Sequence, residues 1–96
     1  MKWLEVLEIR TIYKKSKLFE LELRNVIKKM ENESKIRAIK TFYKSAVETD
    51  FCIQLLHHSE VDNRGSPLGV RLASAFKDFG LVKHSVWCEI VEIQKS

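Results

Sequence analysis

Apolar and β-branched residues gather in four stretches of this 96-residue chain, and two amphipathic segments separate them. Residues 3–12, WLEVLEIRTI, predict a first strand, and residues 36–44 and 50–58 predict two strands joined by a five-residue hairpin loop. A fourth strand is expected over residues 82–93. The first, third and fourth stretches carry apolar residues on both faces, so we expect protein on both sides of this sheet.

The segment between the first and second strands has the spacing of an amphipathic helix. We expect this helix over residues 17–32, with Ser16 as its cap and with Asn32 and Ser34 marking its end. Its apolar residues recur three and four positions apart and form one stripe. The stripe consists of Phe19, Leu23, Val26, Ile27 and Met30.

The second helix has the clearest boundary signals in the chain. Ser66 is a natural N-cap, and Pro67 suits the first helical position. Gly80 is expected to end the helix in a left-handed conformation. The predicted buried stripe of this helix consists of Leu68, Leu72, Ala75, Phe76 and Phe79.

The resulting order, strand–helix–strand–strand–helix–strand, is that of the α+β ferredoxin-like βαββαβ fold. Residues 1–96 fit a single domain of this kind, with a four-stranded antiparallel sheet in the order 4-1-3-2 and two helices on one face. The helices leave the other face open, although its strands carry apolar residues. We therefore expect a homodimer through the open sheet face. The alternative is a less regular register, in which bulges restore one polar face.

Composition and charge narrow the classes of function. The net charge of +4 is weak for a nucleic-acid binder, and the third strand lacks the aromatic residues of an RNA-binding sheet, so no nucleic-acid partner is expected. No apolar run is long enough to span a membrane, and the acids within MKWLEVLEIR argue against a signal peptide, which favours a cytoplasmic location. Cys52 and Cys88 are expected to be buried free thiols. No phosphate loop or paired-thiol motif indicates a cofactor, and none is expected.

The histidines are the first candidates for chemistry. His57 and His58 end the third strand and are followed by Glu60 and Asp62, which are residue types that bind metals. Neighbouring strand residues point to opposite faces, so two adjacent histidines do not easily bind one ion, and surface histidines are the favoured interpretation. His84 stands alone on an otherwise apolar face of the fourth strand. It is either a catalytic base or, more simply, a partly buried histidine with a hydrogen-bond partner.

Carboxylates on the sheet provide the second set of candidates. Trp87 and Glu89 share a face of the fourth strand, and Glu5 is expected close to them on the neighbouring first strand. A carboxylate covered there by a partner could serve as a general base, and it could equally pair with Lys40 or Arg10 across a dimer. The candidate catalytic residues are therefore Glu5, His84, Trp87 and Glu89, without an identifiable nucleophile–base pair.

The element order and the apolar strands WLEVLEI, FCIQLL and VWCEIVEI resemble the dimeric α/β-barrel superfamily, which includes the antibiotic-biosynthesis monooxygenase-like proteins. The resemblance extends from Trp3 to Ile93. It implies a homodimer that holds a small apolar ligand between sheet and helices, as a small-molecule-binding or cofactor-free monooxygenase-like protein. The haem-degrading members carry an Asn on the first strand, which WLEVLEIRT lacks. The alternative function is a non-enzymatic structural or regulatory homodimer.

Overall fold

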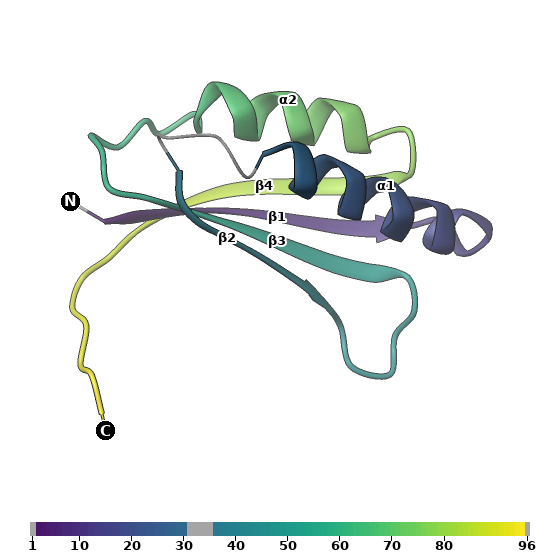
Figure 1. The fold of residues 1–96 in the computed structure, drawn as a ribbon, viewed down its shortest axis with the longest axis horizontal. Coiled ribbons are helices and arrows are strands. Elements are labelled where there is room, and N and C mark those ends of the chain that lie inside the picture. The colour runs from purple at the N-terminus through teal and green to yellow at the C-terminus, as the bar shows by residue number, and fades with distance from the viewer. Residues whose placement is uncertain (1, 31–35, 96) are drawn as a thin grey trace.

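The computed structural model describes residues 2–30 and 36–95, and the helix end expected at Asn32 and Ser34 lies outside these residues. The described chain folds as βαββαβ, which confirms the ferredoxin-like order, and Figure 1 shows both helices on one face of the sheet. The elements are β1 (Trp3–Thr11), a 3₁₀ turn η1 (Tyr13–Lys15), α1 (Ser16–Lys29), β2 (Ile36–Tyr43), β3 (Asp50–His57), α2 (Pro67–Phe76) and β4 (Gly80–Cys88).

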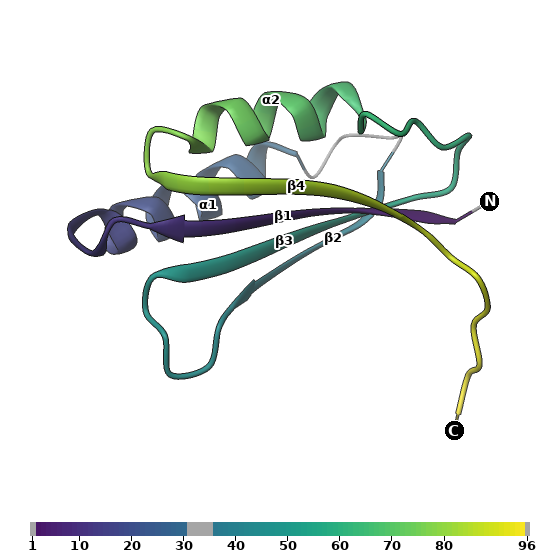
Figure 2. The same ribbon diagram turned by 180° about the vertical axis from the view of Figure 1, so that it is seen from behind.

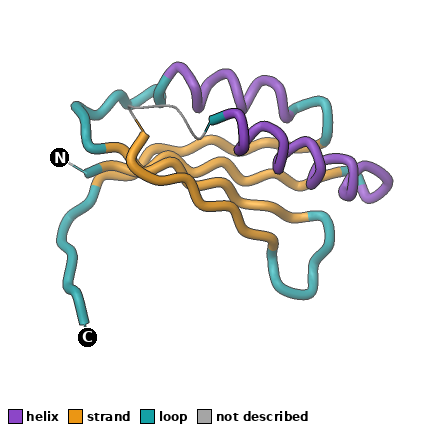
Figure 3. The backbone as a smooth tube through the Cα atoms, in the orientation of Figure 1, coloured by secondary structure: helices purple, strands orange, loops and turns teal. Residues whose placement is uncertain are grey.

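The described strands form a four-stranded antiparallel sheet in the order β2-β3-β1-β4. This is the predicted order, with β1 in the interior between β3 and β4. Figure 3 shows the strands side by side as one layer beneath the helices. One irregularity, a shift in register between Ile36 and Ala38, lies at the start of the edge strand β2. A shift confined to one edge strand does not change which side chains of the other three strands point to each face of the sheet.

The core fills the space between the helices and one face of the sheet. Alternate residues of β1 and β3 point to this face, because successive strand side chains point in opposite directions. Phe19 of α1 lies at the centre, where its ring contacts the rings of Phe51, Phe76 and Phe79. The buried core consists of Leu7, Ile9, Phe19, Leu23, Met30, Phe51, Ile53, Leu55, Leu72 and Phe76.

Several element ends differ from the sequence-based expectation. Ser66 caps α2 as predicted, because its hydroxyl accepts a hydrogen bond from the Gly69 N–H at 3.0 Å. Ser16 does not cap α1, since the turn η1 precedes the helix and the Ser16 hydroxyl donates to the carbonyl of Tyr13. Gly80 does not end α2 in a left-handed conformation; it begins β4, where a Cβ would lie 2.0 Å from the carbonyl oxygen of Arg10.

The open face of the sheet carries both apolar and polar side chains. Figure 2, seen from behind, shows the same bare lower face of the sheet and the C-terminal segment leaving it after β4. Trp87 is 60% exposed there, and Phe42 and Leu81 are exposed as well. The strand expected over 82–93 ends at Cys88, which is exposed rather than buried because it lies at the end of an edge strand. No described residue covers the large apolar side chains of this face.

Candidate functional site

Among the residues that the structure describes, the one buried acidic side chain is that of Glu5, and it lies on the helix-facing side of the sheet. Glu5 of β1 is 0% exposed, on the same strand face as Trp3 and Leu7. The strand register places Trp3 opposite His57 of β3 and Leu7 opposite His84 of β4. Glu5 therefore lies diagonally between the two histidines, one on each neighbouring strand.

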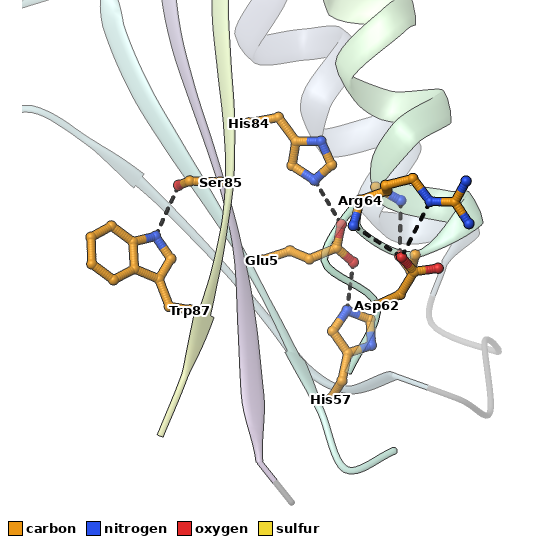
Figure 4. Close-up of polar contacts among 9 residues, drawn as sticks. Glu5, His57, Asp62, Arg64, His84, Ser85 and Trp87 are labelled. Carbon is orange, nitrogen blue, oxygen red and sulfur yellow. Dashed lines mark hydrogen bonds and ion pairs between the residues drawn. The ribbon is translucent and has the colours of Figure 1, made fainter. Parts of the chain in front are cut away.

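Both histidines bond to Glu5 through the same ring atom. The Nε2 atom of His57 lies 2.6 Å from Oε1 of Glu5, and the Nε2 atom of His84 lies 2.8 Å from Oε2 (Figure 4). A carboxylate can only accept, so when Glu5 is ionised both Nε2 atoms carry hydrogen and donate. A neutral ring in that tautomer keeps its lone pair on Nδ1. We call Glu5, His57 and His84 the Glu–His cluster.

Two glycines allow the Glu–His cluster to lie close under the start of α2. A Cβ on Gly69 would lie 1.9 Å from Oε2 of Glu5, and a Cβ on Gly65 would lie 2.5 Å from Cε1 of His84. Gly65 also has a φ of +91°, a conformation that side chains disfavour. The amino end of α2 carries partial positive charge, which stabilises a negative charge on the carboxylate beside it.

His57 forms part of the wall of a pocket at the sheet end where β1 begins and β3 ends. Trp3 stacks on the His57 ring, with the ring centres 4.1 Å apart and an angle of 18° between the planes, and the Trp3 Nε1–H donates to the Ser59 hydroxyl at 3.3 Å. The pocket has a volume of about 680 Å³, within the usual range of small-molecule sites. Its lining includes the apolar side chains of Ile36, Pro67 and Leu68.

Charged groups also line this pocket. Arg37 and Arg71 are basic, and Glu60 and Asp62 are acidic. Asp62 lies 3.7 Å from the Nε of Arg64 and accepts from the backbone N–H of the same residue. His58 lies here too, and desolvation, with the nearby positive charge of Arg37 and Lys2, holds its pKa below the ordinary value.

The structure brings together some of the sequence candidates and separates others. Glu5 and His84 meet, and His57, which the sequence indicated only for metal binding, completes the cluster. The expected proximity of Glu5 to Trp87 and Glu89 is wrong. Trp87 lies opposite Leu4 on the other sheet face and donates to Ser85, as Figure 4 shows. Glu89 is exposed beyond the end of β4.

The expected pairing of Glu5 with Lys40 or Arg10 does not fit the geometry either. Glu5 points toward the helices, whereas Arg10 lies on the open face and forms an ion pair with Asp50, 3.2 Å between charged atoms. In the part of the chain that the structure describes, no three His, Cys, Asp or Glu side chains are arranged to hold a metal ion. The Glu–His cluster has its two Nε2 atoms and both carboxylate oxygens occupied by its own hydrogen bonds.

Comparison with known proteins gives the fold. No protein-family model matches the chain, and no curated protein matches it. Among solved structures, the chain is similar to Rv0793 from Mycobacterium tuberculosis, with a TM-score of 0.76 and 12% sequence identity, over 98% of this chain and 100% of that one. At this identity the similarity supports the ferredoxin-like α+β fold alone. None of the helices in the described residues is long and apolar enough to cross a membrane.

Proposed function

We propose that this protein binds a small organic acid in the pocket beside Trp3 and that His57 acts there as a general base. The observation that carries the proposal is the hydrogen bond between His57 Nε2 and the buried carboxylate of Glu5, in a ring that also lines the pocket. A carboxylate that holds one ring nitrogen as a donor leaves the other nitrogen to accept a proton, as in other carboxylate–histidine pairs.

The pocket lining supports an apolar ligand with a negative group. Trp3, Ile36 and Leu68 offer apolar contacts, and the guanidinium groups of Arg37 and Arg71 suit a carboxylate. The reaction class is removal of a proton from a carbon next to a carbonyl. The proton moves from that carbon to Nδ1 of His57, and its electron pair forms the enolate. We include in this proposal the dimeric α/β-barrel superfamily and the cofactor-free monooxygenase-like activity that the sequence resemblance implies. The enzymes of that superfamily hold their ligand in a cleft between the sheet and the helices.

Phenylpyruvate is a suitable probe, because it combines an aromatic body, a carboxylate and an acidic carbon. We expect the wild-type protein to accelerate exchange of its methylene protons for deuterium in D₂O, followed by proton NMR. His57→Gln should lose about 100-fold or more of this acceleration. His58→Gln is the matched control, since His58 lines the same pocket without a bond to Glu5. Exchange no faster than with free imidazole, or equal exchange by the His57 variant, would contradict the proposal.

The second part of the proposal is a homodimer through the open sheet face. The exposed side chains of Phe42, Leu81 and Trp87 support it, because a monomer rarely leaves such apolar area uncovered. The segment after β4 adds Ile90, which is 98% exposed. Light scattering should give about twice the 11.3 kDa chain mass, and Trp87→Asp should give the monomer with unchanged circular dichroism. A wild-type monomer at micromolar concentration would contradict this assembly.

A structural or regulatory homodimer without chemistry is the competing function. It shares the dimer prediction and is supported by the same exposed side chains of the open face. The deuterium-exchange measurement separates the two functions, because only the catalytic one predicts exchange that depends on His57.

A further inference from the structure

We propose that His84 is the charge-compensating partner of His57: Glu5 supports one imidazolium in the cluster at a time, and uptake of a proton by His57 releases one from His84. The inference rests on the proposed base at His57 and deepens it. His84 has no contact with the pocket in this scheme. It is a positioning residue that acts on His57 through the shared carboxylate.

The geometry connects the two rings through one group. Each oxygen of Glu5 serves one Nε2 atom, at 2.6 Å for His57 and 2.8 Å for His84. His57 lines the pocket, whereas His84 is absent from the pocket lining and keeps 18% of its side chain exposed. The two rings therefore exchange protons with different surroundings, the pocket for His57 and solvent for His84.

The charge of the cluster sets the number of protons. With two neutral rings the cluster carries one negative charge on a carboxylate that is 0% exposed, and a buried uncompensated charge is costly. One imidazolium makes the cluster neutral, whereas two imidazolium rings would make it positive. Burial therefore favours the neutral cluster, in which one of the two rings carries an extra proton. That proton can reside on either ring.

This arrangement suits a catalytic base that is hydrogen-bonded to a buried carboxylate. When the proton resides on His84, His57 is neutral and its Nδ1 is ready to accept. When His57 takes a proton from the ligand at Nδ1, His84 gives its Nδ1 proton to water, and the cluster stays neutral. Each Nε2 atom keeps its hydrogen and its bond to Glu5 throughout. The step thus conserves atoms and charge without moving a proton through the carboxylate.

The other charged groups near His57 lie around the pocket. They are Arg37 of β2, Arg71 of α2, and His58, Glu60 and Asp62 in and after the end of β3. Gly69 of α2 and Gly65 just before this helix approach the cluster most closely, and neither carries a titratable side chain. His84 is thus the ionisable group in bonding contact with the carboxylate that also holds His57.

Ring-nitrogen NMR of the ¹⁵N-labelled full chain tests the coupling in the absence of any ligand. We expect both cluster rings to show the Nε2–H tautomer when neutral, and to share one proton, so that the imidazolium signal of one ring falls as that of the other rises. In His84→Gln, whose amide can still donate to Glu5, the proton should reside on His57 alone, so that its ring is fully imidazolium where the wild type shows partial occupancy. His58→Gln should leave the cluster unchanged.

The outcomes separate this inference from the proposed function. Independent titration of His57 and His84 in the wild type, or the Nδ1–H tautomer in either ring, would overturn the coupling even if His84→Gln does not fold. If phenylpyruvate exchange depends on His57 but the two histidines titrate independently, the proposed base at His57 stands and the proposed role of His84 is overturned. Coupled titration without exchange would support the coupling and overturn the proposed function alone.

Discussion

Replacement of Gly69 by alanine tests whether α2 presses directly on the buried carboxylate. The new methyl group would lie 1.9 Å from Oε2 of Glu5, where ordinary contact begins at 3.4 Å. The carboxylate must therefore retreat by about 1.5 Å, and a movement of that size takes one of its hydrogen bonds beyond bonding range.

The magnitude follows from three opposing contributions. Loss of a hydrogen bond to a charged group costs about 1.5–3 kcal/mol, and overpacking costs about 1–3 kcal/mol. Alanine gains about 1 kcal/mol over glycine within a helix. We therefore expect Gly69→Ala to lower the free energy of unfolding by about 1.5–5 kcal/mol, although the same change in an unconstrained helix stabilises it.

Urea unfolding followed by circular dichroism measures this loss. Ser74→Ala, on the exposed side of the same helix, is the control and should stay within about 0.5 kcal/mol of the wild type. In a Glu5→Ala background the carboxylate is absent, so Gly69→Ala should become neutral or stabilising. An equal loss in both backgrounds, or no loss in the wild type, would refute the close contact between α2 and Glu5.

Two further predictions concern the open face. The Arg10 hydrogen bond holds the pKa of Asp50 below 3.8, its ordinary value, so the stability that this pair adds is complete above that pH and is lost as the pH falls through the folded-state pKa. Asp50→Asn should reduce the acid dependence of the urea midpoint below pH 4, and an unchanged dependence would contradict the role of the pair. Burial, with the negative charge of Glu8, raises the pKa of the Cys52 thiol, so iodoacetamide should label the exposed Cys88 first. Faster labelling of Cys52, measured by mass spectrometry, would overturn this order.

The fold could be predicted from sequence because its signals are local. The β-branched and aromatic residues of WLEVLEIRTI and the Ser66–Pro67 start of the second helix are local signals, and the strand and the helix start that they predict were confirmed. The strand order followed from the element order. The ends of the helices were harder to predict from sequence. The turn η1 before Ser16 and the start of β4 at Gly80 depend on contacts with distant backbone.

The Glu–His cluster depended on strand register, which sequence alone does not determine. The sequence analysis recognised that His84 stands alone on its strand face, but it placed Glu5 close to Trp87, which lies on the opposite face of the sheet. A shift of one residue in pairing reverses every side chain, so only the observed ladder brings the three groups together. Two signals were available in the sequence: an acidic residue within a buried strand face, and two glycines, Gly65 and Gly69, on either side of the Ser66–Pro67 helix start.

The shared carboxylate also constrains how this sequence can change over generations. Replacement of Glu5 leaves two imidazoles without their acceptor, and replacement of His57 or His84 leaves a buried carboxylate with half of its donors. Each single step is therefore costly, and glycine at position 69 is favoured over any residue with a Cβ as long as the carboxylate is present. These identities should be inherited as a block, present together in some descendants of a common ancestor and replaced together in others.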